Sequence, residues 1–256
     1  MTETTQTQIA TLAALLAHRP ATVFFGGAGV STESGIPDFR SAAGLYAAQN
    51  VYGYPPEELL SRRFFERETA LFFRYYKENL IAKDAKPNAA HLALTELERR
   101  GLLRAVVTQN IDGLHQAAGS QKVLELHGSN WRHYCVRCRA KYGLDYLLHP
   151  AAMREGVIPL CEKCGGVVRP NVVLYGEGLD EDVVAQAMRE IARAELLIVG
   201  GTSLAVYPAA GLLHYFRGNH LVLINKSETA YDGVADLVIR ESIGAVLGAA
   251  VERLNA

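Results

Sequence analysis

The sequence predicts an α/β fold: a mostly parallel sheet with helices on both faces, plus a helical insertion and a small metal-binding lobe. Three observations predict it. Short apolar runs of strand length alternate with amphipathic segments of helix length along most of the chain, as in consecutive β–α–β units. Two polar blocks, at residues 26–41 and 108–115, each follow an apolar run. Two longer stretches interrupt the alternation.

Apolar or β-branched runs too short for a helix are assigned as strands. The predicted strands are residues 21–25, 102–108, 122–126, 196–200, 220–225 and 235–239. Asn88 is a favourable N-cap for the helix that follows it, and Gly101 ends that helix. Leu92 and Leu97 are expected on its buried side. The predicted helices are residues 9–18, 89–100, 180–194, 208–217 and 243–254.

The two interruptions define the expected domains. Residues 42–87 are rich in Tyr and Phe and are predicted as a helical insertion, and residues 129–169 contain all four cysteines. The remaining residues, 1–41, 88–128 and 170–256, form the sheet domain. Because both interruptions leave the same sheet, we expect them to pack together over its carboxyl edge, where open α/β sheets bind ligands.

Composition limits the function classes. The chain has 256 residues, 49% of them hydrophobic, with 26 basic and 27 acidic side chains, so it can bury a large core and has no field that favours nucleic acid or a membrane surface. No apolar run approaches the roughly 20 residues that span a bilayer. The first residues resemble neither a secretory signal nor a transit peptide. We therefore expect a cytoplasmic protein.

The cysteines form two C-x-x-C pairs, Cys135 with Cys138 and Cys161 with Cys164. Two such pairs suit a tetrahedral Cys₄ zinc site, because each short loop offers two thiolates to one ion. With four sulfur ligands and no open position, the zinc would be structural. The alternatives are local disulfides or a redox pair.

The glycine block after the first strand, Gly27-Ala28-Gly29, begins like a Rossmann fingerprint. Thr32 stands where the third glycine belongs, and such turns also arise for steric reasons alone. The polar run from Ser31 to Arg40 favours a ligand, since a guanidinium can hold a pyrophosphate through two donors. Residues 225–227, at the end of a later strand, could supply ribose contacts.

A second polar cluster, Gln109, Asn110 and Asp112, follows another strand. It suits ribose hydroxyls, a carboxamide or a water molecule. His127 follows the next strand and precedes a glycine, which places its imidazole at the sheet edge. A neutral imidazole can take a proton from a hydroxyl near neutral pH, as general base catalysis requires. The alternative is a purely structural histidine.

With these residues the chain resembles the sirtuins, NAD-dependent protein-lysine deacylases. The resemblance covers nearly the whole chain. The motifs that carry it are GAGVSTESGIPDFR, TQNIDGLH, LHG, the paired C-x-x-C, RPNVVLYGE, GTSLAVYPA and INKS.

The resemblance implies a Rossmann-like domain that binds NAD, a zinc lobe, and an acyl-lysine peptide between them. Ile111 and Asp112 would hold the nicotinamide carboxamide, Asn110 would orient ribose and water, and His127 would be the base. The acyl group would pass to ADP-ribose as nicotinamide leaves. The residues predicted to line the dinucleotide are Gly27, Ala28, Gly29, Ser31, Thr32, Asp38, Phe39, Arg40, Gln109, Asn110, Ile111, Asp112, His127, Gly201, Thr202, Ser203, Asn225, Lys226, Ser227 and Ile243.

The acyl-lysine peptide would enter as a strand between two segments of the protein, so that backbone pairing gives affinity. In sirtuins that remove succinyl or malonyl groups, a Tyr-x-x-Arg pair meets the acyl carboxylate. Phe73 and Tyr76 stand at those positions here, without the cation, which predicts a preference for acetyl or other neutral acyl groups. The residues predicted to contact the substrate are Val173, Tyr175, Gly176, Glu177, Leu204, Val206, Tyr207, Phe73 and Tyr76.

Three alternatives share parts of this pattern. A mono-ADP-ribosyltransferase would release nicotinamide but label protein with ADP-ribose. A binding module that senses NAD would have little need for Asn110, Asp112 and His127 together. A hydride-transferring dehydrogenase fits poorly, because the third fingerprint glycine is absent.

Overall fold

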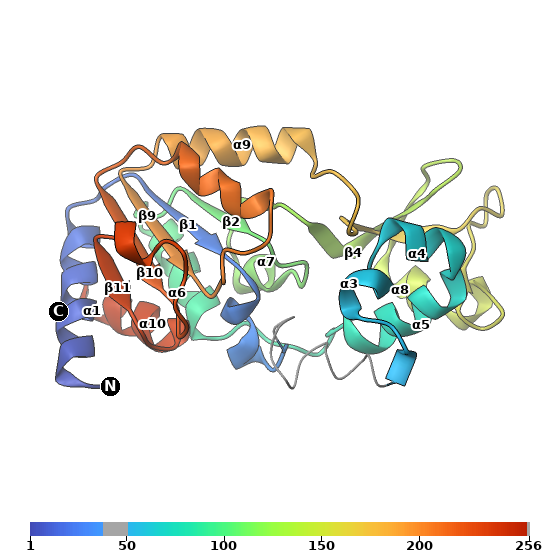
Figure 1. The fold of residues 1–256 in the computed structure, drawn as a ribbon, viewed down its shortest axis with the longest axis horizontal. Coiled ribbons are helices and arrows are strands. Elements are labelled where there is room, and N and C mark those ends of the chain that lie inside the picture. Colours follow the sequence, from blue (N-terminus) through green and yellow to red (C-terminus); the bar gives the residue numbers. More distant parts are fainter. Residues whose placement is uncertain (38–50, 255–256) are drawn as a thin grey trace.

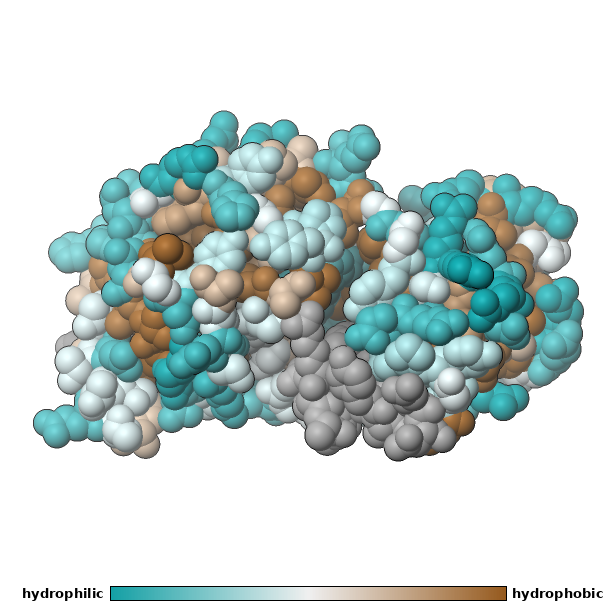
Figure 2. Space-filling model, in the orientation of Figure 1, coloured by the Kyte–Doolittle hydropathy of each residue, from teal (hydrophilic) through white to brown (hydrophobic). Residues whose placement is uncertain are grey.

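The computed structural model describes residues 1–37 and 51–254, which form two lobes (Figure 1). Asp38, Phe39 and Arg40 lie outside the described residues. On the molecular surface, a notch separates the lobes in the same view (Figure 2). The larger lobe contains a six-stranded sheet in the order β11–β10–β9–β1–β2–β3, and all neighbouring strands are parallel. Its strands are β1 (Thr22–Gly26), β2 (Ala105–Thr108), β3 (Val123–Glu125), β9 (Leu196–Gly200), β10 (His220–Ile224) and β11 (Leu237–Ile239).

The sheet confirms the six strands predicted from the sequence, with shifts of their ends. The run predicted for residues 102–108 becomes a strand only from Ala105. The N–H groups of Leu102 and Leu103 instead donate to the carbonyl of Leu97, at the end of the preceding helix. These two leucines therefore close a helix before the chain enters the sheet.

Helices cover both faces of the large sheet, as predicted (Figure 1). Alternate residues of β1 serve the two faces: Phe24 packs with the helices of one face, whereas Val23 and Phe25 pack with those of the other. The first face carries α1 (Glu3–Ala17), α6 (Ala89–Arg99) and α10 (Ile243–Arg253), and the second carries α9 (Glu181–Ala192) and the 3₁₀ helix η4 (Ala209–Tyr215).

Three helix predictions need correction. The helix predicted for residues 9–18 begins at Glu3, because the Thr2 side chain caps it by accepting from the Thr5 N–H. The segment at residues 208–217 is a 3₁₀ helix and not an α-helix. The prediction that Leu92 is buried is wrong, since it is 55% exposed. Five residues turn an α-helix by about 500°, which places Leu92 roughly 140° from Leu97.

The smaller lobe combines residues from both interruptions of the sheet domain. One core contains side chains from α5 and from α8 and the segment around Leu174. Its elements are α3 (Pro56–Leu59), α4 (Arg62–Arg67), α5 (Thr69–Asn79), β4 (Gly128–Cys135), β5 (Lys141–Gly143), α8 (Leu144–Leu148), η3 (Pro150–Ala152), β6 (Met153–Arg154), β7 (Ile158–Pro159) and β8 (Val168–Val172). The antiparallel sheet β5–β4–β8 and the hairpin β6–β7 complete it.

The strand order reverses direction at β1. From β1 the chain proceeds through β2 to β3 on one side, whereas β9, β10 and β11 lie on the other. Ligands of open α/β sheets bind at such a switch point, beyond the carboxyl ends of the strands. The remaining short elements are η1 (Ala28–Val30), η2 (Thr32–Ser34), α7 (Leu114–Ala118) and η5 (Asp232–Val234). Across the described parts of the chain, no helix has the length and apolar character to span a membrane.

Candidate active site

The loop after β1 lies against the loop after β9, at the reversal of strand order. The Gly29 N–H donates to the Gly201 carbonyl over 2.8 Å. A Cβ atom on Gly29 would come within 2.8 Å of the Gly201 Cα atom, so the two loops touch backbone to backbone. The glycine block thus serves the contact between loops, which sequence alone does not reveal. It leads into η1, a 3₁₀ turn.

The loop after β2 joins the same cluster through side chains. Ser31, which is 1% exposed, donates its hydroxyl to Asp112 Oδ2 over 2.7 Å and accepts from Asn110 Nδ2 over 3.0 Å. The Asp112 Oδ1 atom accepts from the Leu114 N–H. Ser31 of the glycine block and the Asn110 and Asp112 side chains of the second polar cluster therefore form one network. Thr32 lies beside it but is exposed.

Gln109 connects the β2 loop to the β9 loop. Its side-chain Nε2 donates to Thr202 Oγ1 over 3.0 Å, and its N–H donates to the Gly26 carbonyl over 3.0 Å. The Thr202 hydroxyl also accepts from the Leu204 N–H over 3.2 Å. Three strand ends are thus linked before any ligand is considered, which reduces the ordering that a ligand must impose.

The imidazole of His127 lies beside this network. Its Nδ1 atom is 2.9 Å from the carbonyl oxygen of Gln109. A carbonyl oxygen only accepts, so Nδ1 carries the proton and Nε2 is the nitrogen that can accept one. Burial lowers the pKa of His127 from its usual 6.5, and the hydrogen bond to Gln109 offsets part of that effect. The ring is therefore a neutral base near pH 7.

Further predicted dinucleotide residues lie at the ends of β9 and β10. Asn225 follows β10, and its side chain donates to the Ser227 carbonyl over 2.8 Å. Lys226 is exposed, as is Ser203. Ile243 is 4% exposed and packs on Gly200, where an added Cβ would meet it. Ile243 therefore supports the floor of the β9 loop.

The segment after β8 is tied to the small lobe by its backbone. The Tyr175 N–H donates to the Leu60 carbonyl over 3.0 Å, and the Arg62 N–H donates to the Tyr175 carbonyl over 3.0 Å. The Val173 N–H donates to the His127 carbonyl over 3.0 Å. The segment predicted to hold the peptide is thus hydrogen-bonded, through Val173, to the backbone of the predicted base.

A buried ion pair fixes the turn of this segment. Arg169 donates to both carboxylate oxygens of Glu177, over 2.6 and 3.0 Å, and Glu177 Oε2 also accepts from the Leu174 N–H. Burial raises the pKa of Glu177, but Arg169 and the Leu174 N–H outweigh burial, and the pKa falls below its usual 4.5. The guanidinium also lies 5.2 Å from the centre of the Phe65 ring.

The opposite segment, residues 204–207, follows Thr202. Leu204 is buried, Val206 is partly buried, and Tyr207 is 66% exposed. Phe73 and Tyr76 are fully buried in the core of the small lobe. Tyr76 donates to Asn130 Oδ1 over 2.5 Å. Neither ring is therefore open to solvent.

The four cysteines of the small lobe form one cluster. Their Sγ atoms all lie within 4.8 Å of one another, and none of the four is in a disulfide. Sulfur ligands about 2.3 Å from a tetrahedral zinc ion lie roughly 3.8 Å apart, and the Cys135–Cys164 and Cys138–Cys161 pairs are 3.4 and 3.6 Å apart. The donor set and its spacing fit a structural zinc ion.

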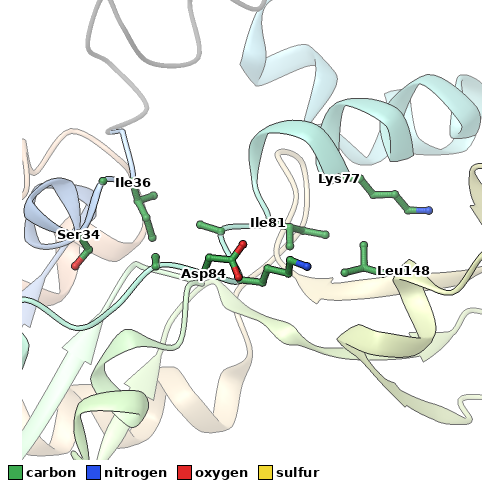
Figure 3. A pocket seen from close by; sticks show the side chains of 10 residues that line it. Ser34, Ile36, Lys77, Ile81, Asp84 and Leu148 are labelled. Atoms are coloured by element: carbon green, nitrogen blue, oxygen red, sulfur yellow. The ribbon is translucent and has the colours of Figure 1, made fainter.

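A cavity of about 500 Å³ lies where the lobes meet. Ser34 and Ile36 lie on one side of it and Lys77 and Leu148 on the other, with Asp84 between them (Figure 3). No predicted site residue of the described chain lines this cavity. It therefore marks the junction of the lobes and not the predicted position of the dinucleotide.

Two residues near the site were missed by sequence reasoning. Arg169 was visible in the RPNVVLYGE motif, but its bond to Glu177 depends on the fold. Trp131, the single tryptophan of the chain, donates its indole N–H to the Asp112 carbonyl over 2.7 Å. The only feature of the sequence that could have indicated a place near the site was its position, four residues after His127.

Comparison with known proteins identifies the family of this chain. The Sir2 family profile matches residues 27–208. A Clostridium acetobutylicum protein named NAD-dependent protein deacetylase is 58% identical over 233 residues, which cover 91% of this chain and 94% of that protein. A Cutibacterium acnes protein of the same name is 50% identical, over 93% of this chain and 95% of that protein.

Solved structures agree with the sequence relatives. A structure of Sir2 with a p53 peptide and NAD⁺ superposes with a TM-score of 0.81 at 40% identity, over 93% of this chain and 95% of that one. A Sir2 variant with a deacetylated p53 peptide and 3′-O-acetyl-ADP-ribose gives a TM-score of 0.87 at 39% identity, over 96% and 98%. The chain belongs to the Sir2 family.

Proposed function

We propose that this protein is an NAD-dependent protein-lysine deacetylase that yields free lysine, nicotinamide and O-acetyl-ADP-ribose. The observation that carries the proposal is the His127–Gln109 contact beside the Ser31–Asn110–Asp112 network. A protein that only bound NAD would have no need for a neutral imidazole with one nitrogen free to accept a proton. Relatives named NAD-dependent protein deacetylase, at 58% identity, support the same reaction.

NAD supplies a ribose carbon from which nicotinamide leaves when the acetyl oxygen attacks. In our proposal Ile111 and Asp112 hold the nicotinamide carboxamide, and Asn110 orients a ribose hydroxyl. His127 Nε2 takes the proton from that hydroxyl, whose oxygen then bonds to the acetyl carbon. The bond from that carbon to the lysine nitrogen then breaks and releases the lysine amine, and addition of one water molecule completes O-acetyl-ADP-ribose. Nδ1 keeps its proton and donates it in a hydrogen bond to the Gln109 carbonyl, which keeps the ring in one orientation.

The acetyl-lysine peptide would lie between residues 173–177 and residues 204–207. The Val173 N–H bond to the His127 carbonyl supports this position, because it connects one of the two segments to the proposed base. The remaining predicted dinucleotide residues, including Asp38, Phe39 and Arg40, keep the roles that the family resemblance implies. The four cysteines would hold a structural zinc ion, remote from bond making because it would have no open coordination position.

We place the protein in the cytoplasm. A Cys₄ zinc site needs reduced thiols, and reducing compartments maintain them. The four free thiols of the small lobe support this location.

The test is mass spectrometry of an acetyl-lysine peptide incubated with the protein, with and without NAD. We expect loss of the acetyl group, matched by equal amounts of nicotinamide and O-acetyl-ADP-ribose, only when NAD is present. The His127→Ala variant is the matched control and should bind NAD while forming little product. Nicotinamide without deacetylation would instead identify ADP-ribosyl transfer or NAD hydrolysis.

A further inference from the structure

Trp131 lies in a bulge of β4 between the two lobes. β4 pairs with β8 at Ser129–Asn171 and again at His133–Pro170, so three residues of β4 intervene where β8 has none. Bulges near active sites often re-aim a side chain. Here the bulge leaves Trp131 48% exposed, directly after the buried Ser129 and Asn130.

The bulge holds the turn that contains Asp112. The Asn130 N–H donates to the Ile111 carbonyl over 2.9 Å, and the Trp131 indole N–H donates to the Asp112 carbonyl over 2.7 Å. Two successive residues of β4 therefore bind two successive carbonyls of the turn. These bonds orient the peptide planes on both sides of Asp112.

The indole ring also packs on the next residue of the turn. Gly113 has a φ of 76°, and a Cβ atom there would come within 2.6 Å of the Trp131 Nε1 atom. The contact is thus direct, between the ring and the glycine backbone. Only glycine combines the left-handed conformation with the space that the ring requires.

We propose that Trp131 is a positioning residue: its indole N–H and ring hold the Ile111–Gly113 turn in the orientation in which Asp112 receives the nicotinamide carboxamide. The inference rests on the proposed function, which gives Asp112 that role. The carboxylate itself is held by Ser31 and by the Leu114 N–H. Trp131 therefore completes the support of Asp112 from the backbone side.

A second consequence concerns fluorescence. Trp131 is the only tryptophan in the chain, and its indole donates to the residue proposed to bind nicotinamide. Binding of nicotinamide or NAD should change the emission of this single fluorophore. The protein thus carries a natural probe of the nicotinamide site.

The kinetic test uses Trp131→Phe, which keeps an aromatic ring and removes the N–H donor. We expect the KM for NAD and the inhibition constant of nicotinamide to rise about two- to tenfold, the loss of one hydrogen bond. The KM for the acetyl peptide should stay within about twofold, since a local change leaves distant contacts intact. Tyr215→Phe, which removes a polar group from another exposed aromatic ring, is the control and should match the wild type.

The spectroscopic test titrates the wild type with nicotinamide while tryptophan emission is recorded. We expect a saturable change, added to the linear collisional quenching that free N-acetyl-tryptophanamide also shows. Asp112→Asn should shift the midpoint of the saturable part. Purely linear quenching, in a protein that calorimetry shows to bind nicotinamide, would overturn the proposal.

The outcomes separate the two claims. If the wild type deacetylates peptide but Trp131→Phe keeps every constant within twofold, only the positioning role is wrong. A general loss of folding would lower the melting temperature and affect both KM values together, and would also count against the role. If the wild type neither turns over nor binds NAD, the proposed function and this inference both fall.

Discussion

The Nδ1 atom of His127 lies 2.9 Å from the Gln109 carbonyl oxygen, and this contact gives the imidazole one protonated and one basic nitrogen. Gln109 also donates to Thr202 and to Gly26. The residue that orients the base is therefore itself fixed to two other strand ends. The orientation of His127 depends on the sheet rather than on a mobile side chain.

The first prediction concerns His127 and pH. Since burial lowers the pKa of His127 from 6.5, the basic form should persist below that pH, and kcat/KM should fall only at more acid values. His127→Ala should lose about a hundredfold or more in turnover, as expected for a general base. The check is a pH–rate profile with NAD binding measured in parallel. An acid limb centred above 6.5 would contradict the assignment.

The second prediction concerns acid stability. Burial lowers the pKa of His91 to about 4 and that of His115 to about 3. The unfolded chain then binds more protons than the native state below pH 6.5, so stability is complete above 6.5 and is lost as pH falls. Each histidine should cost about 1.4 kcal/mol per pH unit below its usual pKa.

Urea denaturation between about pH 7.5 and 5 tests this, because carboxylates titrate mostly below that range. His127 and His133 are also buried with a lowered pKa, so His115→Leu removes one of four such groups and should reduce the slope by roughly a quarter. A midpoint independent of pH would show that both rings are charged or exposed in the native protein.

The third prediction concerns the cysteine cluster. The protein should contain one zinc ion per chain, released when the thiols are modified. Its removal by a strong chelator should lower the melting temperature by about 10 °C or more, because the binding energy of a structural zinc is folding energy. Adding zinc back should restore the transition. An apo protein with an unchanged melting temperature would exclude a structural zinc ion.

The fourth prediction compares two ion pairs. Arg169 and Glu177 are 7% and 18% exposed, whereas Arg62 and Glu66 are 61% and 58% exposed. Glu177→Ala leaves a buried guanidinium unpaired and should destabilise the protein by about 3 kcal/mol. Glu66→Ala should change stability by less than about 1 kcal/mol.

A milder change at the same site should separate substrate binding from folding. Glu177→Gln keeps an acceptor for the Leu174 N–H, and it should raise the KM for the acetyl peptide more than the KM for NAD. Equal effects on both constants would mean that the ion pair acts only on overall stability.

The fifth prediction concerns the acyl group. Phe73 and Tyr76 are buried. The Lys77 ammonium lies 5.9 Å from the centre of the Phe73 ring, but it donates to the Val157 carbonyl over 2.8 Å. A succinyl carboxylate would be left unpaired, at a cost of several kcal/mol. Acetyl and propionyl peptides should turn over at least about a hundredfold faster than succinyl peptide. Equal rates would require a cation within reach of the acyl group.

The sequence predicted the sheet well because parallel strands buried on both faces are short continuous apolar runs. Strand ends were less certain, as Leu102 and Leu103 show by capping a helix. Leu92 was misjudged because it stands five positions before Leu97, a spacing that places the two leucines on different faces of a helix. The helix signal at Asn88 was specific and was confirmed, since its side chain accepts from the Ala90 N–H.

For the candidate site, the sequence identified residue types and strand ends but not their connections. The Trp131–Asp112 bond spans 19 positions, and the Gln109–Thr202 bond spans 93. Neither has a local pattern, because the first joins the two lobes and the second joins two strand ends of the large sheet. The same holds for Gly29. Its N–H donates to the Gly201 carbonyl, a contact that the spacing of the glycines does not predict.

The hydrogen bond from Gly29 to Gly201 joins an early part of the chain to a late one. Synthesis of the chain passes the glycine loop, the base and all four cysteines before it reaches β9. A nascent chain that ends before Gly200 therefore has the proposed base and all four cysteines, but it has no wall opposite the glycine loop. We therefore expect deacetylation only after β9 has joined the sheet, so that partly folded chains do not consume NAD through this site.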